Sequence, residues 1–326
     1  MSELEPLRLV FERPGDGPAL PQELRRLYGG DLLLPERCLY ANFVSSLDGV
    51  VAIPSVPGSS AMIGGPSDAD RFVMGLLRAA ADVVLIGSGT LVSSPRGRWR
   101  PETVFPPAAD GYAALRRELG HTASPRVAVV TASGSIPGDH PALEDGALVL
   151  TTRAGAARLA STLPGRAELE VLPGESEVDI RTAVELLYAR GHNRILSEAG
   201  PHVFGSLVAD GLVDELFLTV SPLLAGRGGE ETLGLVEDAP FLPGRVERAV
   251  LRSVRIHGSH VFLQQMLAER LRESSAGDTG RMPTEHQPPS PFPPPAPPPQ
   301  PEPPIPGPDP LPPPDPTPPD PDSRAR

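Results

Sequence analysis

The sequence predicts an α/β protein with a mostly parallel central sheet and a late pair of antiparallel strands. Short apolar runs alternate with segments of helical periodicity along most of the chain, which is the pattern of parallel β-α-β units. Two of the runs, at residues 81–90 and 194–201, end in glycine turns that lead directly into helical segments. Such turns present backbone N–H groups at a helix N-terminus, where an anion binds favourably. We therefore expect a phosphate-bearing cofactor and substrate along one edge of the sheet.

The individual elements follow from periodicity and from the residues that interrupt it. Apolar runs bounded by turn residues predict strands at residues 38–44, 50–53, 81–87, 126–131, 147–152, 169–172, 194–197, 214–220, 246–256 and 260–266. Amphipathic periods, several of them closed by glycine, predict helices at residues 21–28, 66–80, 154–162, 178–190 and 201–210. Residues 54–66 and 93–110 lack either pattern, and the second of these segments is expected to be a long surface loop.

Composition divides the chain of 326 residues into three segments. Residues 1–35 are expected to form an irregular N-terminal segment, and residues 36–270 a single folded domain. Residues 283–326 contain more than half of the 44 prolines and almost no apolar side chains. Such a segment cannot bury enough surface to compensate for its ordering entropy, so residues 271–326 are predicted to be a disordered, proline-rich tail.

Charge and composition exclude several classes of function. The net charge of −12 argues against nucleic acid or an anionic membrane as the main partner. Cys38 is the only cysteine, which rules out an intramolecular disulfide and a cysteine-based metal site, and the histidines form no cluster, so no metal is assigned. No apolar run reaches the length of a signal core or a membrane span, and the chain is expected to be cytoplasmic.

The two glycine turns each have a structural and a functional interpretation. Gly87 and Gly89 permit close backbone approach, and Thr90 can either cap the following helix or bind a phosphate oxygen. A tight connection capped by threonine explains this turn equally well. Glu198, by contrast, places a carboxylate at the end of an apolar strand, which is costly unless the group is paired or used.

Two arginines are candidates for gripping a substrate phosphate. Arg71 and Arg78 are seven residues apart and share one face of the predicted helix. Arg78 can alternatively pair with Asp82 at the surface, an interaction of little energetic value. The chain contains neither a Gly-x-Ser-x-Gly elbow nor a phosphate-binding P-loop, so hydrolase and nucleoside-triphosphatase functions are poorly supported.

Taken in order, the segments resemble the pyrimidine reductase of riboflavin biosynthesis, the C-terminal domain of the bifunctional deaminase-reductase, in the dihydrofolate-reductase-like superfamily. The match runs from about residue 38 to residue 265 and implies a three-layer sandwich. Its pieces are Ser46-Leu47-Asp48-Gly49, Leu76-Leu77-Arg78-Ala79 with Asp82-Val83-Val84-Leu85-Ile86-Gly87-Ser88-Gly89-Thr90, Arg126-Val127-Ala128-Val129-Val130-Thr131, Glu198-Ala199-Gly200-Pro201, Val213-Asp214-Glu215-Leu216, and Ser221-Pro222-Leu223-Leu224-Ala225-Gly226.

The resemblance implies an NADPH-dependent reductase that transfers hydride to the ribose of a pyrimidine ribosylamine phosphate, and it implies a homodimer. The catalytic residues would be Asp48, which orients substrate or relays a proton, and Glu198. Substrate contacts would come from Ser60, Arg78 and Glu198. Cofactor contacts would come from Met62, Gly87, Gly89, Thr90, Thr131, Gly200, Pro201, His202, Val203, Phe204, Gly205 and Ser206, with Arg153 a candidate for the 2′-phosphate by position.

The chain departs from the family pattern after the first glycine turn. Many members have an acidic Asp-Pro or Glu-Pro segment there, whereas this chain has Ser93-Ser94-Pro95. The substrate-phosphate contacts of this loop are therefore uncertain, and Arg96, Arg98 and Arg100 are candidates to replace them. The deaminase zinc site requires a pair of cysteines, so the chain is expected to be a stand-alone reductase.

Two other functions stay open. A dihydrofolate or pterin reductase would keep the fold and the NADPH, and it would need no phosphate on its substrate. A non-catalytic nucleotide-binding protein would use the proline-rich tail as its working part, because such stretches dock into aromatic grooves of partner modules.

Overall fold

The computed structural model describes residues 4–229 and 231–267. These belong to the first of two compact units, Met1–Asp278, and the second unit, Thr279–Arg326, lies outside the described residues, as does the predicted tail. Among the described residues, none of the helices combines the length and apolar character needed to cross a membrane.

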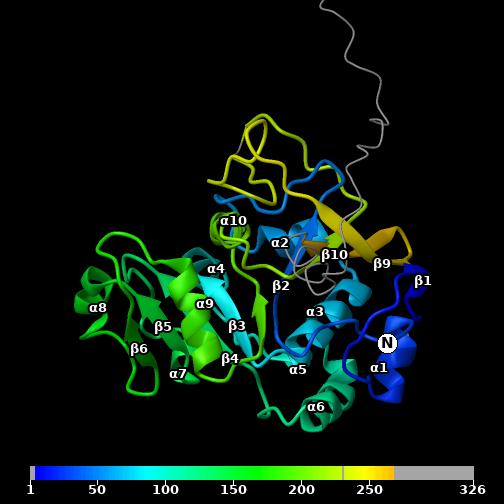
Figure 1. Cartoon of the computed structure of the whole chain (residues 1–326), viewed down its shortest axis with the longest axis horizontal. Helices are drawn as coiled ribbons and strands as arrows, with labels where there is room; N and C mark the ends of the chain where they lie inside the picture. Colours follow the sequence, from blue (N-terminus) through cyan, green and yellow to red (C-terminus); the bar gives the residue numbers. More distant parts are fainter. Residues whose placement is uncertain (1–3, 230, 268–326) are drawn as a thin grey trace, which may run out of the picture. The chain divides into compact units, whose positions relative to one another are not determined.

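A ten-stranded mixed sheet organises the described residues, with strand order β1-β9-β10-β8-β2-β7-β3-β4-β5-β6 (Figure 1). Neighbours from β8 to β6 run parallel, and the late strands β9 and β10 pair antiparallel, as predicted. The pairs β8–β10 and β9–β1 are antiparallel as well. The strands are β1 Arg8–Glu12, β2 Cys38–Ser45, β3 Val83–Gly87, β4 Arg126–Thr131, β5 Leu148–Thr151, β6 Glu168–Val171, β7 Arg194–Ser197, β8 Glu215–Val220, β9 Ala249–His257 and β10 His260–Leu267.

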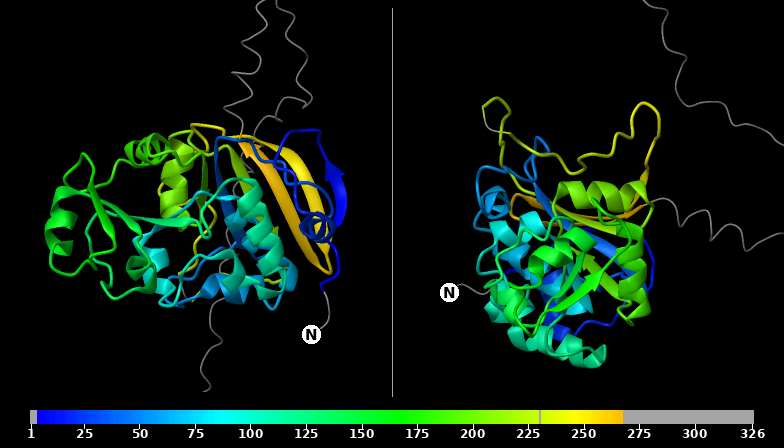
Figure 2. Two further views of the ribbon diagram at one scale, coloured as in Figure 1. Left: turned by 90° about the horizontal axis from the view of Figure 1, so that it is seen from below. Right: turned by 90° about the vertical axis from the view of Figure 1, so that its left-hand side faces the viewer.

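Helices cover both faces of the sheet and complete three layers (Figure 2). Successive residues of a strand point to opposite faces, so alternate positions feed two separate cores. The larger core packs α1, α3 and α6 on one face, and the other core packs α9 and α10 on the opposite face. The helices are α1 Gln22–Tyr28, α2 Ser59–Gly64, α3 Asp68–Ala80, α4 Ser88–Ser93, α5 Pro101–Val104, η1 Pro106–Ala108, α6 Ala109–Glu118, α7 Pro141–Glu144, α8 Arg153–Leu159, α9 Ile180–Ala189 and α10 Pro201–Ala209.

The N-terminal segment is not irregular, contrary to expectation. Its predicted helix forms as α1, but residues 8–12 also form a strand that pairs antiparallel with β9, with Leu9 opposite Arg255. In Figure 2 the blue strand β1 lies beside the yellow and orange strands β9 and β10. Because the partner strand lies far along the chain, local sequence pattern carried no sign of this pairing.

Two predicted loops and one predicted strand also differ from expectation. Residues 54–66 contain the short helix α2, and residues 50–53 make only an isolated bridge, from Ala52 to Leu233. Residues 93–110 contain α5 and η1 rather than a surface loop. Trp99 is buried against His140, and Phe105 is buried edge-on against Phe72, so burial of aromatic rings gives this segment its structure.

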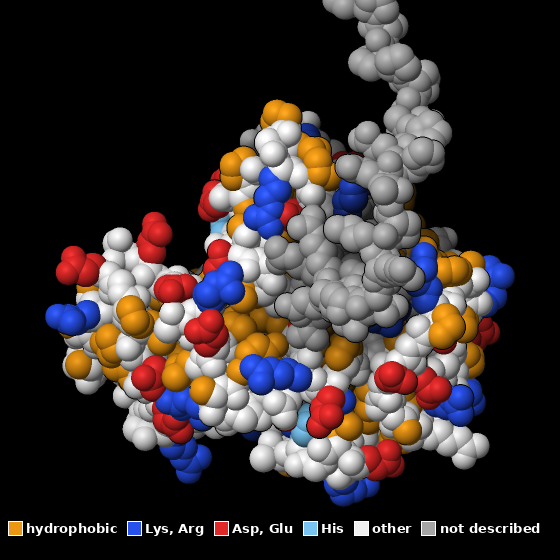
Figure 3. Space-filling view, viewed as in Figure 1, with side chains coloured by type: hydrophobic (Ala, Val, Ile, Leu, Met, Phe, Trp, Pro, Cys, Tyr) orange, Lys and Arg blue, Asp and Glu red, His pale blue; other side chains and the backbone are white. Residues whose placement is uncertain are grey.

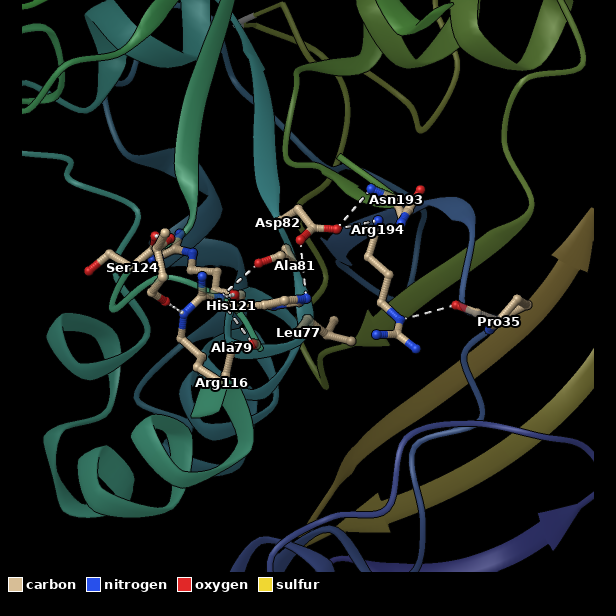
Figure 4. Close-up of polar contacts among 12 residues, drawn as sticks. Pro35, Leu77, Ala79, Ala81, Asp82, Arg116, His121, Ser124, Asn193 and Arg194 are labelled. Atoms are coloured by element: carbon tan, nitrogen blue, oxygen red, sulfur yellow. Dashed lines mark hydrogen bonds and ion pairs between the residues drawn. The ribbon is translucent and has the colours of Figure 1, made fainter. Parts of the chain in front are cut away.

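A polar network fixes the amino ends of the central strands (Figure 4). The Asp82 carboxylate, just before β3, accepts hydrogen bonds from the backbone N–H groups of Asn193 (2.9 Å) and Arg194 (2.8 Å). Its other oxygen lies 3.1 Å from His121 Nε2. Asp82 therefore joins β3 to β7 at the amino edge, and it is not the partner of Arg78 that the sequence allowed.

The same network holds the C-terminal end of α3. The buried Arg116 guanidinium donates hydrogen bonds from Nη1 to the carbonyl oxygens of Arg78 (3.2 Å), Ala79 (3.0 Å) and Ala81 (2.8 Å). A cation at this position satisfies the free carbonyls that end every helix. It anchors the turn of α3 that carries the Arg78 side chain.

Candidate active site

The carboxyl ends of the parallel strands place the predicted site residues along one edge of the sheet. Ser197, the last residue of β7, is in register with Ala41 of β2 and with Leu85 of β3. In the same way Ser45, the last residue of β2, pairs with Val220 at the end of β8. The loops that follow β2, β3, β7 and β8 therefore leave the sheet side by side, and this is where ligands bind in α/β sheets.

Arg78 and Glu198 form a two-point ion pair at this edge. Arg78 Nε lies 2.8 Å from Glu198 Oε1, and Arg78 Nη2 lies 2.6 Å from Oε2. The two side chains are only 12% and 10% exposed. Parallel N–H···O bonds between charged groups are both strong and directional. The pairing explains how a carboxylate can end an apolar strand, and it brings two predicted substrate residues together.

Asp48 is held as a carboxylate by three hydrogen-bond donors. Its oxygens accept from the Ser46 hydroxyl (2.6 Å) and from the backbone N–H groups of Ala225 (3.0 Å) and Gly226 (2.8 Å). The Ser46 hydroxyl, followed by these two amides, lowers the pKa of Asp48 to about 2. A carboxyl with this pKa carries no proton at neutral pH. The geometry makes Asp48 a hydrogen-bond acceptor at this edge of the sheet.

The two glycine turns meet, as the sequence predicted. A Cβ at Gly200 would lie 3.9 Å from Thr90 Oγ1, and a Cβ at Gly87 would lie 3.3 Å from Val203 Cγ2. Pro201 begins α10, and the N–H groups of the first helical turn have no acceptor within the helix. The junction thus offers free amides without obstructing side chains, and these features fit the phosphates of a nicotinamide dinucleotide.

Phe204 and Gly205 of the predicted cofactor run pack into the protein instead, whereas Ser206 is exposed. The Phe204 ring is buried against Phe43, with ring centroids 4.8 Å apart. Gly205 lies directly beneath a neighbouring loop, since a Cβ there would come within 2.1 Å of the Glu237 carbonyl oxygen. The Ser206 hydroxyl donates to the carbonyl of His202. Within this run, the first turn of α10 therefore offers the geometry for a cofactor, and the later residues hold the helix in place.

The other predicted contacts are spread along the same edge. Thr131 is buried, and its hydroxyl accepts from the backbone N–H of Gly134 (3.1 Å), so it shapes the turn after β4. Ser60 and Met62 are exposed on α2, and Gly89 is exposed in the first turn of α4.

Arg153 stands further along the edge, beside a cavity of about 260 Å³ that also contacts residues 171–175. Because β5 lies three strands from β7, Arg153 is displaced from Glu198 by roughly 14 Å at the usual strand spacing. An extended dinucleotide can span that distance.

Two arginines of the loop that follows α4, Arg98 and Arg100, form ion pairs with Asp145 of the same chain. Arg98 Nη1 lies 2.5 Å from one oxygen of Asp145, and Arg100 Nη2 lies 2.8 Å from the other. One carboxylate therefore neutralises two of the three arginines proposed to hold a substrate phosphate. Arg96 is exposed on the same loop.

Asp70 lies in the site although its sequence position did not mark it. It follows the helix cap Ser67 by three residues, a position where an acid usually belongs to the cap itself. In the structure it lies near the Thr219 hydroxyl of β8 and senses the charge of Glu198. Burial, as the largest influence, raises the pKa of Asp70. The available signal was its spacing of eight residues from Arg78, which puts both on one helix face.

Comparison with known proteins agrees with this architecture. The family model described as the RibD C-terminal domain matches residues 37–242. A curated relative, the 2,5-diamino-6-ribosylamino-4(3H)-pyrimidinone 5′-phosphate reductase of Archaeoglobus fulgidus, is 25% identical over 197 residues, covering 60% of this chain and 84% of the relative.

Solved structures show the same fold. A pyrimidine reductase-like protein from Corynebacterium diphtheriae superposes with a TM-score of 0.59 at 22% identity, covering 76% of this chain and 98% of that one. A diaminohydroxyphosphoribosylaminopyrimidine deaminase/5-amino-6-(5-phosphoribosylamino)uracil reductase from Thermotoga maritima gives 0.53 at 19% identity, and the match covers 72% of this chain and 57% of that longer one. The family model spans well over half of the sequence, and the chain therefore belongs to the RibD C-terminal domain family, with the dihydrofolate-reductase-like fold.

Proposed function

We propose that this protein is an NADPH-dependent reductase of riboflavin biosynthesis that acts on a pyrimidine ribosylamine 5′-phosphate. The observation that carries the proposal is the Arg78–Glu198 pair, which stands directly before the phosphate-binding geometry at the start of α10. One short segment, residues 198–203, would thus adjoin both the substrate and the cofactor. Membership of the RibD C-terminal domain family and the substrate named for the Archaeoglobus fulgidus reductase support this assignment.

The cofactor would be held by backbone rather than by charged side chains. The free amides at the start of α10 would bind its pyrophosphate, and Gly200 keeps the approach open beside Thr90. Arg153, in its cavity near the end of β6, would bind a 2′-phosphate and so favour NADPH over NADH. When bound, the nicotinamide supplies a hydride.

The protein side chains would position the substrate for that transfer. The Arg78–Glu198 pair is rigid because two hydrogen bonds fix it, and its remaining donor and acceptor sites can bind ribose hydroxyls. Asp48 would accept a further hydroxyl hydrogen bond, since its carboxylate is ionised at neutral pH. The net charge of −12 and the interspersed charges visible in Figure 3 also favour a small-molecule substrate over nucleic acid.

The test is oxidation of NADPH by the purified full-length chain, followed by the loss of its near-ultraviolet absorbance. The pyrimidine ribosylamine phosphate and dihydrofolate are offered in parallel, each with NADPH and with NADH. Turnover of the ribosylamine phosphate with a preference for NADPH is the expected result. Failure to turn it over, at enzyme concentrations where NADPH binds, would contradict the proposal.

One observation favours a second candidate, a pterin reductase on the same fold. Arg98 and Arg100 are both engaged by Asp145, so the loop offers less positive charge to a substrate phosphate than three free arginines would. A pterin substrate requires no phosphate site. Turnover of dihydrofolate alone in the parallel assay would establish this alternative.

The homodimer stays a prediction from the resemblance. At the antiparallel end, the outermost strand is β1, where Leu9, Val10 and Phe11 are exposed. A second copy adding to this edge would cover them. Light scattering coupled to size-exclusion chromatography measures the mass in solution and decides between one chain and two.

A further inference from the structure

His260 is a half-buried histidine beside the candidate site that has no role so far. It is the first residue of β10, and Phe262, two residues further along the strand, belongs to the core under α3. Alternate residues of a strand point to the same face, so the imidazole also points to the α3 face. Its Nε2 lies 2.9 Å from the carbonyl oxygen of Gly64, the last residue of α2 (Figure 1). Because a carbonyl can only accept, Nε2 carries the hydrogen and donates it.

The helix that His260 contacts borders the turn of Asp48. Ile63 of α2 is buried in a small cluster with Val44 and Val50. Val44 is the penultimate residue of β2, and Val50 follows Asp48 by two residues. α2 therefore packs over the carboxyl end of β2, where the substrate site is expected. A shift of α2 would change the surface beside Asp48.

α2 needs tertiary contacts to keep its position. It has only six residues, and isolated helices shorter than about 12 residues are barely stable in water. The small cluster contains three buried apolar residues, of which α2 supplies only Ile63. Gly58 and Gly65, both at positive φ, flank the helix, and no side chain caps its first turn. Contacts at the two ends therefore decide where α2 lies.

The two ends of α2 are held by different groups. At the first end, the buried Ser59 hydroxyl accepts from the backbone N–H of Ile53 (2.9 Å). At the other end, the Gly64 carbonyl is one of the free carbonyls that end a helix, and His260 supplies its donor. Gly64 also packs closely on α3, because a Cβ there would lie 3.3 Å from Asp70 Oδ2. His260, 196 residues away in the chain, thus ties the C-terminal end of α2 to the late strands.

The hairpin of β9 and β10 does not itself require this histidine. Its two-residue turn is formed by Gly258, at positive φ, and Ser259. His257 lies directly opposite His260 across the hairpin, and both imidazoles are half-buried. In the part of the chain that the structure describes, His257 has no hydrogen bond or ion pair. One histidine of the pair therefore contacts α2, and the other provides an internal comparison.

We propose that His260 is a positioning residue of this active site, which fixes α2 through the Gly64 carbonyl. Ser60 and Met62 are thereby presented to substrate and cofactor. The inference rests on the proposed reductase function, in which Ser60 would contact substrate and Met62 the cofactor. Both side chains are exposed on α2, whereas Ile63 is buried. A surface that is already ordered spares the ligand the free-energy cost of ordering it. The hydrogen bond thus acts on binding rather than on hydride transfer.

The first experiment measures substrate and cofactor binding in full-length His260→Ala, His260→Gln and His257→Ala. Loss of one hydrogen bond at the end of α2 should raise KM for the pyrimidine ribosylamine phosphate and Kd for NADPH about 3- to 10-fold, with kcat within about twofold of the wild type. His260→Gln keeps an N–H donor at nearly the same reach, so it should restore most of both values. His257→Ala should change neither. Wild-type KM and Kd in His260→Ala, or equal changes in His257→Ala, would overturn the inference.

A second measurement needs no substrate. Hydrogen–deuterium exchange followed by mass spectrometry reports the opening of individual segments of the full chain. Residues 58–65 should exchange at least about 3-fold faster in His260→Ala than in the wild type, whereas α10 should exchange at the same rate in both. Unchanged exchange at residues 58–65 would overturn the inference. A wild type that reduces neither test substrate would overturn the proposed function and the positioning role together, whereas an active wild type with unaltered binding and exchange in His260→Ala overturns the positioning role alone.

Discussion

Arg78 and Glu198 lie 120 residues apart in the chain and meet through two hydrogen bonds of 2.8 and 2.6 Å. The first comes from the last turn of α3 and the second from the residue after β7, so the pair ties a helix to the carboxyl edge of the sheet. On the helix side, Arg116 holds the backbone of the same turn through carbonyl oxygens. The candidate substrate site is therefore built on a helix and a strand end rather than on a long loop, as accurate positioning would require.

Glu198→Gln should lower kcat/KM far more than it lowers stability. The amide keeps the shape and one acceptor but removes the charge opposite Arg78, and misplacement of a substrate-positioning group costs on the order of 100-fold. The free energy of unfolding should fall by only about 1–3 kcal/mol, the scale for one compromised buried polar contact. Steady-state kinetics and urea denaturation measure the two effects. Glu168→Gln is the matched control, because Glu168 pairs with Arg126 at 2.7 Å in a more exposed position remote from the site. Wild-type kcat/KM in Glu198→Gln would show that the site is misplaced.

Asp48→Asn should destabilise the protein in a pH-dependent way. The pKa of Asp48 is lowered in the folded state to about 2 from the ordinary aspartate value of 3.8, so its stabilising contribution is present above pH 3.8 and is lost as pH falls towards 2. The difference in unfolding free energy between wild type and Asp48→Asn should therefore be largest at neutral pH and vanish in acid. Urea denaturation across this range tests it, with Asp179→Ser as a comparison that removes another capping carboxylate outside the site. A difference independent of pH would mean that the hydrogen bonds, rather than the charge, hold the turn.

Gly89→Leu should block the cofactor without harming the fold. A Cβ at Gly89 would meet nothing within 4 Å, so the protein itself has room for a side chain there. If the dinucleotide lies over the turn between β3 and α4, the leucine occupies its space and the Kd for NADPH should rise at least about 10-fold. Fluorescence titration measures the Kd, and thermal unfolding checks the fold. Gly165→Leu, at another glycine whose Cβ would be in open space, should change neither quantity. An unchanged Kd in Gly89→Leu would remove this turn from the cofactor site.

Arg153→Ala should weaken NADPH but not NADH. The two cofactors differ by the 2′-phosphate, and a charge-assisted hydrogen bond to such a group corresponds to a change of about 10- to 100-fold in Kd. Isothermal titration with both cofactors separates this effect from general damage. Arg158→Ala is the control on the same helix, since Arg158 is bound to the Ser133 carbonyl and does not line the cavity. Equal weakening of both cofactors would place the 2′-phosphate elsewhere.

Local pattern alone was sufficient for most of the sheet. The strand at residues 194–197 was predicted with its observed bounds, because a short apolar run between polar residues and a glycine turn is typical of a buried strand. The sequence also predicted that the turns at Gly87 and Gly200 lie close together, since the carboxyl ends of parallel strands lie at one edge of the sheet. Strand β1 was not predicted, because it pairs with the distant strand β9 and pairing between distant segments leaves no local periodicity.

In the loop that carries Arg96, Arg98 and Arg100, the structure gives individual residues roles other than those expected from the sequence. Trp99 and the prolines around it suggested a solvated segment, but the indole ring is buried against His140. Arg98 and Arg100 were candidates for a substrate phosphate until Asp145, more than forty residues away, was found between them. The sequence gives the type of a charged side chain, but only the folded structure shows which group it pairs with.

Three features of this protein follow from its amino-acid sequence, because each depends on neighbours within a few residues. They are the order of the elements, the sheet edge that carries the candidate ligand site, and the glycines that leave this edge open. The surroundings of three carboxyl groups at that edge do not follow from such neighbours. Asp48, Asp70 and Glu198 are all acids beside helices or turns, yet one is held by two amides and a hydroxyl, one by burial under α2 and β8, and one by Arg78. A pKa depends on solvent exclusion and on charges brought together from distant segments. The environments of these carboxyl groups are therefore determined by tertiary packing and not by local sequence.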